Sequence, residues 1–427
     1  MIKKDLIFES NFFSILFVGF TFFFTFYFGA LYSPDTEGYL NMDIYRSLGY
    51  PFFIAIHKLI FGTFYLNALL FSQFLINIFS IFYLKKCLKK CLNISNWNSN
   101  FVLLLLAIPF FYEIKVINNI LSEAIAYPLF LLVVGNIFYF ITFKNFKNFY
   151  YSILLILLLI QVRGQFLFFV PVVISAIIIS KINNSFTKSH WIAFVFAVLI
   201  PFISIGADIT FHKIAHNKAV TTPWTGIQIS AMPFFVSKPS DSLLFKSKLQ
   251  KDYFNYIYSN LEKKKILLSQ VPEYPLSKID FYFANYTNIA NSTIGNFGEE
   301  FFKNNNAPDE LVILNDKISS SITLSLMKNN FNNWSKLYLQ NISKGIGSAK
   351  ILILTFFLLI FSLIKIIKDE NNIAKFIFIG TLLIIGNIFL VAIAEPTTSR
   401  YCFYTNWILI SIVMVLFQQT FYKKNDV

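Results

Sequence analysis

Long apolar stretches are the feature that most constrains this chain. A membrane-spanning helix needs about 20 mainly apolar residues. Ten candidate stretches, three of them short, recur along the sequence, at about 12–32, 63–84, 101–113, 124–143, 150–162, 166–180, 191–212, 346–366, 376–394 and 402–421. Only 14% of the residues are charged, against about 25% in an average soluble domain. The sequence therefore predicts an all-α integral membrane protein with about ten transmembrane helices.

The distribution of basic residues predicts the orientation of these helices. Short loops on one side of the predicted membrane carry fifteen lysines, and those on the other side carry five basic residues. Cytoplasmic loops are enriched in Lys and Arg, so both termini are predicted to be cytoplasmic. The net charge of +14 does not indicate a nucleic-acid partner, because the lysines are spread between apolar segments and form no basic stripe.

This topology divides the chain into three predicted parts. An N-terminal transmembrane module covers residues 1–212, a helical extracytoplasmic domain covers 213–345, and C-terminal transmembrane helices cover 346–427. The apolar stretch 51–62 is too short to span a bilayer and contains His57 and Lys58. We expect it to form an amphipathic helix lying at the membrane interface.

The first outer loop, residues 33–53, has the sequence SPDTEGYLNMDIYRSLGYPFF and concentrates charge. Acidic groups close to a membrane face are costly and usually serve ions or substrates. The same face receives all three arginines of the chain, Arg46, Arg163 and Arg400. Arginine grips phosphate through two parallel hydrogen bonds, which lysine cannot do. Arg163 and Arg400 are alternatively explained as lipid-headgroup anchors.

Carboxylates and arginines at an outer membrane face suit the transfer of a sugar from a polyprenyl-phosphate carrier to a hydroxyl group. A carboxylate accepts the proton of the acceptor hydroxyl as general base. Arginines stabilise the phosphate that leaves. Oxygen ligands on Asp35 and Glu37 also predict a bound Mg²⁺ or Mn²⁺ ion.

Short motifs in this chain resemble those of the GT-C superfamily of polytopic glycosyltransferases. Asp35-Thr-Glu37 is similar to their acidic DxD/DxE-type signature in the first outer loop. The segment from Arg46 through Gly49-Tyr50-Pro51 resembles the R-x-P-G-Y-P sequence of many bacterial members. The chain departs from this pattern at Leu48, which stands where the family has its first proline.

Three further matches follow in the family's order. Leu121-Ser122-Glu123 is similar to L-S-E-P, Gln161-Val162-Arg163-Gly164 to L-x-R-P, and Ser399-Arg400-Tyr401 to a late R-Y pair. Proline is missing after Glu123 and after Arg163. The predicted outer domain also lies between the seventh and eighth spans, whereas many relatives place it at the C-terminus.

The resemblance implies a bacterial inner-membrane enzyme that uses a polyprenyl-phosphate-linked sugar and inverts the anomeric carbon. Its acceptor would be a cell-envelope glycan or lipid. Asp35 corresponds to the general base and Glu37 to a metal or substrate ligand. The predicted substrate and phosphate contacts are Arg46, Tyr50, Glu123, Arg163, Glu395, Arg400 and Tyr401.

Two other functions fit the same topology. An O-antigen or polysaccharide polymerase or ligase shares the many spans and the outer arginines, but it is expected to use arginines of its large outer loop, and residues 213–345 contain none. A lipid-linked glycan flippase or transporter is expected to carry ionisable groups near the membrane centre, where these spans have almost none. The glycosyltransferase hypothesis requires its scattered residues to converge in one pocket.

Overall fold

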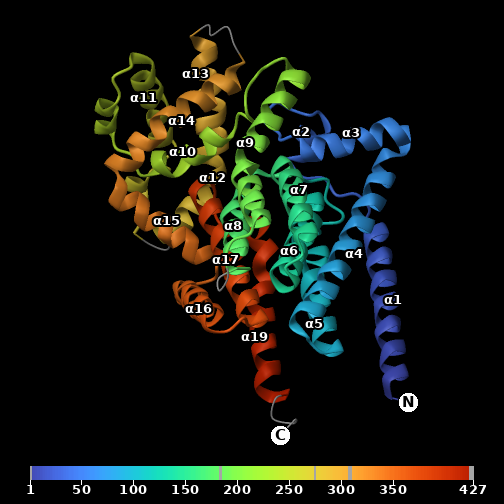
Figure 1. The fold of residues 1–427 in the computed structure, drawn as a ribbon. Helices are drawn as coiled ribbons and strands as arrows, with labels where there is room; N and C mark the ends of the chain where they lie inside the picture. Colours follow the sequence, from blue (N-terminus) through green and yellow to red (C-terminus); the bar gives the residue numbers. More distant parts are fainter. Residues whose placement is uncertain (1, 182–184, 274–275, 306–309, 423–427) are drawn as a thin grey trace. The chain divides into compact units, whose positions relative to one another are not determined.

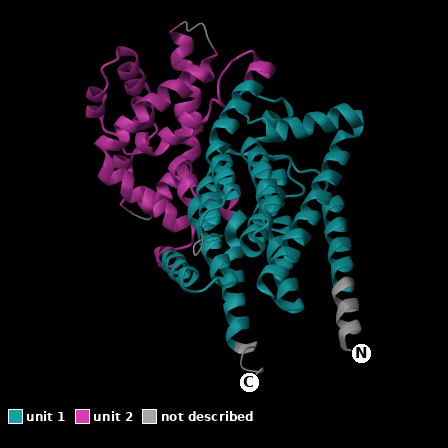
Figure 2. Cartoon of the chain, in the orientation of Figure 1, with its two compact units in different colours: residues 1–211, 355–387, 403–427 teal, residues 212–354, 388–402 magenta. Residues whose placement is uncertain are grey.

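The computed structural model describes residues 2–181, 185–273, 276–305 and 310–422. Within these residues the chain is all-α, as predicted, and contains no strand beyond one isolated bridge between Leu31 and Asn119. The chain divides into two compact units. The first unit comprises residues 1–211, 355–387 and 403–427, and the second comprises residues 212–354 and 388–402 (Figure 2). The three-part division predicted from sequence stays a prediction.

The first unit contains most of the long apolar helices (Figure 1). Its helices are α1 (Ile2–Phe28), α2 (Thr36–Leu40), α3 (Gly49–Phe61), α4 (Tyr65–Leu92), α5 (Asn96–Phe111), α6 (Glu123–Phe143), α7 (Phe146–Val162), α8 (Phe169–Ile179) and α19 (Asn406–Tyr422). Short 3₁₀ segments precede α4, α8 and α19 at Gly62–Phe64, Gly164–Phe168 and Phe403–Thr405. Three helices pass from one unit into the other: α9 (Lys188–His216), α16 (Ala349–Lys368) and α17 (Asn372–Ala394).

Six helical segments in the described residues are long and apolar enough to cross a membrane. They are Gly49–Leu92, Glu123–Phe143, Lys188–His216, Ala349–Lys368, Asn372–Ala394 and Ser399–Thr420. The four other predicted spans fall on shorter apolar helices, at Phe12–Phe28, Asn96–Phe111, Phe146–Val162 and Gly164–Ile179. Length and composition therefore support a multi-pass membrane protein.

Helix α6 forms the centre of the first unit. Its sequence is apolar on all sides, a pattern that indicates a helix surrounded by other helices. In its most apolar 18-residue stretch, 83% of the residues are buried. It packs between α4 and α7. Small residues let helices approach closely: a Cβ atom at Gly135 would come within 2.7 Å of the Tyr83 ring on α4. Burial of α6 places its first residue, Glu123, in the protein interior.

Helix α3 follows the first loop and runs at a steep angle to α4 (Figure 1). The two helices separate at Gly62, whose φ of +53° favours glycine. At the other end of α3, a Cβ on Gly49 would lie 2.6 Å from Val162 Cγ2 and 2.8 Å from the Val162 nitrogen. This close approach brings the loop before α3 to the end of α7, next to Arg163. The helix predicted at 51–62 is present, and its position at the membrane interface stays a prediction.

The second unit is built from shorter helices around its own apolar core. They are α10 (Thr225–Phe235), α11 (Lys248–Lys263), α12 (Lys278–Thr287), α13 (Gly298–Asn304), α14 (Leu311–Asn329), α15 (Phe331–Gly345) and α18 (Ser399–Cys402). The other regular segments are a π-helical stretch at Asn288–Phe297 and 3₁₀ turns at Pro239–Leu244 and Leu268–Gln270. Gly226 lets α10 pack directly on α14, because a Cβ there would clash with the Asp316 carbonyl oxygen.

Candidate functional site

The first outer loop is anchored to the segment that precedes α6. The Leu31 nitrogen donates to the Asn118 carbonyl at 2.8 Å, and the Ile120 nitrogen donates to the Leu31 carbonyl at 3.0 Å. The buried Thr36 hydroxyl donates to the Ile120 carbonyl at 3.1 Å. These bonds hold α2 against residues 118–122. They therefore set the position of Asp35, directly before α2, relative to Glu123.

Asp35 and Arg46 form an ion pair inside this loop. Arg46 Nη2 lies 2.9 Å from Asp35 Oδ1, and it also reaches the Asp35 carbonyl oxygen at 3.4 Å. The side chain of Asp35 is 34% exposed and that of Arg46 is 18% exposed. The pair is therefore open to solvent on the carboxylate side.

Two tyrosine rings and a glycine enclose the Arg46 guanidinium. Its central carbon lies 4.4 Å from the centre of the Tyr39 ring and 5.1 Å from that of Tyr45, distances typical of cation–π contacts. A Cβ atom at Gly38 would lie only 2.8 Å from Arg46 Nε, so this enclosure requires glycine there. Within it, Nε is buried and has no hydrogen-bond partner among the residues that the structure describes.

Asp43 and Tyr45 complete the loop. The Tyr45 hydroxyl donates to Asp43 Oδ2 at 2.6 Å. Burial, followed by this bond to an anionic acceptor, raises the pKa of Tyr45 to about 12. The phenol is therefore a stable donor at neutral pH, and it fixes the Asp43 carboxylate, whose Oδ2 would lie 3.1 Å from a Cβ atom on Gly38.

Glu123 and Arg163 form a second, more deeply buried ion pair. Glu123 is the first residue of α6, and Arg163 is the extended residue between α7 and the following 3₁₀ turn. Arg163 Nη1 lies 2.7 Å from Glu123 Oε1, with side-chain exposures of 13% and 0%. Arg163 Nε also donates to Gln165 Oε1 at 3.0 Å. The arginine is thus fixed on two sides.

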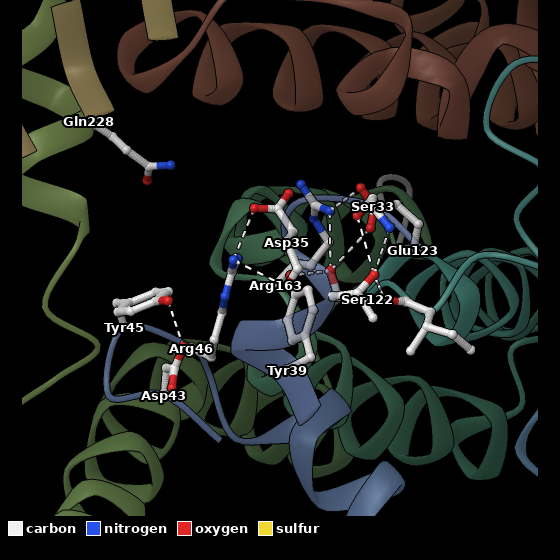
Figure 3. A network of polar contacts seen from close by, with 12 residues as sticks. Ser33, Asp35, Tyr39, Asp43, Tyr45, Arg46, Ser122, Glu123, Arg163 and Gln228 are labelled. Carbon is white, nitrogen blue, oxygen red and sulfur yellow. Dashed lines mark hydrogen bonds and ion pairs between the residues drawn. The ribbon is translucent and has the colours of Figure 1, made fainter. Parts of the chain in front are cut away.

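Ser122 and Tyr39 join the two ion pairs into one network (Figure 3). The Ser122 hydroxyl accepts hydrogen bonds from the Tyr39 hydroxyl at 3.0 Å and from Arg163 at 3.2 Å. It donates to Glu123 Oε2 at 3.3 Å. Tyr39 also contacts Arg46 through its ring face. Four predicted residues, Asp35, Arg46, Glu123 and Arg163, therefore belong to one continuous set of polar contacts.

Tyr50 and Glu37 lie apart from these contacts. The Tyr50 side chain is fully buried, and its hydroxyl donates to Gln73 Oε1 at 2.8 Å. Its ring packs edge-on against Tyr39 at 5.3 Å between centroids, so it helps to hold the Tyr39 ring in place. Glu37 is exposed in the first turn of α2.

The predicted metal site consists of Asp35 and Glu37 in the first outer loop. Mg²⁺ usually keeps several waters and is held by one or two carboxylates together with substrate phosphates. Among the described residues, no group of three or more His, Cys, Asp or Glu side chains is placed to hold a metal ion. Asp35 instead pairs with Arg46. The Mg²⁺ or Mn²⁺ ion therefore stays a prediction, and no chemical step is assigned to it.

Glu395, Arg400 and Tyr401 belong to the second unit. Glu395 follows α17 and accepts a hydrogen bond from the Gln228 amide. The buried Asn341 holds this turn, because its amide donates to the Glu395 carbonyl at 2.9 Å and its oxygen accepts from the Thr397 nitrogen at 2.9 Å. The Arg400 guanidinium lies 5.8 Å from the Tyr401 ring centre. Convergence of these three residues with the first-unit network stays a prediction.

Tyr39 and Ser122 are not among the site residues predicted from sequence. Ser122 directly precedes Glu123, and Tyr39 lies two residues after Glu37, and this closeness to a motif is the only sequence signal that could have identified them. Their bond joins positions 83 residues apart, and no local pattern encodes such a pairing. Gln165, which binds Arg163 and also donates to Asn387 at 3.2 Å, was missed for the same reason.

Comparison with known proteins does not assign the chain to a family. No family model matches the chain, and neither a curated protein nor a solved structure matches it. Support for a function therefore comes from the site itself and from the resemblance of its motifs to those of the GT-C superfamily.

Proposed function

We propose that this protein is a membrane glycosyltransferase of the GT-C type with about ten transmembrane helices. It moves a sugar from a polyprenyl-phosphate donor to a cell-envelope glycan or lipid at the outer face of a bacterial inner membrane. The six long apolar helices support the membrane location. The four shorter apolar helices supply the remaining spans, and α3 lies at the interface beside the first loop.

The observation that carries the proposal is the continuous network at the first loop. Asp35 and Arg46 on the loop connect through Tyr39 and Ser122 to the pair formed by Glu123 and Arg163. The partly exposed carboxylate of Asp35 and the guanidinium of Arg46 provide a base and a phosphate-binding group together, and the buried pair supports them.

The proposed reaction is a single displacement at the anomeric carbon. Asp35 accepts the proton of the acceptor hydroxyl as its oxygen forms the new bond to the sugar. The bond between the anomeric carbon and the phosphate oxygen breaks, and its electron pair leaves with the polyprenyl phosphate. Attack from the opposite face inverts the configuration. Arg46 stabilises the charge that develops on the leaving phosphate.

The Glu123–Arg163 pair has a positioning role in this proposal. Because Glu123 is fully buried and already bound to Arg163, it is a poor acceptor for a substrate proton. Instead it fixes Ser122, which receives the Tyr39 hydroxyl and so orients the ring beneath Arg46. The buried pair thereby holds the exposed pair in place.

The test is a donor-consumption assay on the purified protein in liposomes. Labelled polyprenyl-phosphate hexoses and pentoses are supplied with a bacterial lipid extract as acceptor, and release of free polyprenyl phosphate is measured. We expect release from at least one donor, together with transfer of label to the extract. Consumption only of an assembled glycan on pyrophosphate would support a polymerase or ligase. Movement of lipid-linked sugar across the bilayer without bond cleavage would support a flippase.

A further inference from the structure

The Arg46 guanidinium has one nitrogen that donates hydrogen bonds to Asp35 and other nitrogens that donate none to the residues that the structure describes. Nη2 donates to two oxygens of Asp35, the carboxylate Oδ1 and the main-chain carbonyl. Nε is buried and has no hydrogen-bond partner within the described part of the chain. An arginine carries five N–H donors in a fixed fork, and most of those on Arg46 have no acceptor among the described residues. The group is held by rings and by one carboxylate, and its hydrogen-bonding capacity is largely free.

An anion that binds Arg46 must compete with Asp35. Phosphate oxygens engage a guanidinium through two parallel hydrogen bonds, and the Nη2 donor of that fork is the one bound to Asp35. Two negative groups around one cation repel each other. The Asp35 side chain is 34% exposed and can turn toward solvent, whereas the Tyr39 and Tyr45 rings keep Arg46 in position.

We propose that the donor phosphate displaces Asp35 from Arg46, so that the general base is released only when donor is bound. This inference rests on the proposed function and adds a regulatory order to it: donor first, acceptor second. In the free enzyme the ion pair keeps the carboxylate occupied. Phosphate binding transfers the guanidinium to the donor, and the Asp35 carboxylate, no longer bound to Arg46, then accepts the proton of the incoming hydroxyl group.

A matched pair of acidic residues allows a direct test. Asp35 binds Arg46, whereas Asp43, in the same loop, binds the Tyr45 hydroxyl. Asp35→Asn and Asp43→Asn remove the same charge, but only the first removes the competitor for Nη2. Binding of polyprenyl monophosphate to both variants and to wild type is measured in detergent micelles, alongside inorganic phosphate. Thermal unfolding of each variant establishes that it is folded.

We expect Asp35→Asn to bind polyprenyl monophosphate at least about tenfold more tightly than wild type, and clearly more tightly than Asp43→Asn, because a charge-assisted hydrogen bond no longer has to be broken. Adding Arg46→Gln to the Asp35→Asn variant should abolish this gain in affinity. A gain for inorganic phosphate of equal size would show that the headgroup alone drives the exchange, and a larger gain for the lipid would show that the chain contributes. Either result supports the exchange.

Equal affinity of Asp35→Asn and Asp43→Asn, or no phosphate binding by any variant, would overturn the exchange. Failure of the proposed function gives a different result. If Asp35→Asn binds phosphate more tightly but the wild type consumes no polyprenyl-phosphate sugar, the exchange stands and the glycosyltransferase assignment is wrong. If the wild type transfers sugar but Asp35→Asn shows no gain in phosphate affinity, the glycosyltransferase assignment stands and the exchange is wrong.

Discussion

The two carboxylate–arginine pairs of the first unit have the same chemistry in different surroundings. Asp35–Arg46 lies in a loop, and its carboxylate side chain is one-third exposed. Glu123–Arg163 lies where α6 begins and α7 ends, and its carboxylate is inaccessible. An exposed pair contributes little to stability because water screens it, whereas breaking a buried pair leaves an uncompensated charge. The first pair is suited to exchange partners during a reaction, and the second is suited to hold structure.

The largest difference between the pairs should appear in catalysis. Asp35→Asn keeps the shape of the side chain but removes the proposed base, and the rate of sugar transfer should fall by about 10²–10⁴-fold. The free energy of unfolding in detergent should change by less than about 1 kcal/mol. Near-normal transfer by this variant would exclude Asp35 as the base.

For stability we expect the buried pair to matter more than the partly exposed pair. Arg163→Ala leaves Glu123 buried without its ion-pair partner, and the apparent free energy of unfolding in detergent should fall by about 3–5 kcal/mol. Arg46→Ala removes a partly exposed ion pair and two cation–π contacts, and it should lower the same quantity by a smaller amount, about 1–2 kcal/mol. The double variant Glu123→Gln/Arg163→Met serves as control and should recover much of the loss. Equal losses for the two arginine variants would contradict the distinction between the pairs.

The link between the pairs should have an intermediate effect. Tyr39→Phe removes the bond to Ser122 but keeps the ring beneath Arg46, so unfolding should become easier by about 0.5–1.5 kcal/mol. Tyr39→Leu also removes the cation–π contact, which adds about 0.5–1 kcal/mol. Chemical unfolding of the two variants in the same detergent measures the increment. No difference between Phe and Leu would show that the ring does not hold Arg46.

The smallest effect is a pH dependence from Tyr45 in the exposed loop. Its pKa is raised in the folded protein to about 12, above the ordinary value of about 10. The neutral phenol is favoured by folding, so its contribution to stability is complete below pH 10 and is lost as the pH rises toward 12. The melting temperature of wild type should fall more steeply than that of Tyr45→Phe over this interval. Parallel curves would contradict this assignment.

The helices of this protein could be predicted because apolar length is a local property of the chain. The stretch 124–143 was expected to be a helix, and α6 covers Glu123–Phe143. Some boundaries required tertiary contacts: α3 begins at Gly49, earlier than the expected residue 51, where the glycine packs on Val162. The division into two units was also beyond sequence, because residues 388–402 join the second unit through contacts such as Asn341 with Thr397.

The sequence by itself determined which residue types are available at the site. Asp35, Arg46, Glu123 and Arg163 stand out because charges are rare in so apolar a chain, and rarity can be read from one sequence. Only the tertiary structure decided their partners, their burial and their connection through Tyr39 and Ser122. Pairing across 83 residues depends on how helices pack, and packing depends on the shapes of many side chains at once. Burial then separates two chemically identical pairs, because the cost of leaving a charge alone depends on its access to water.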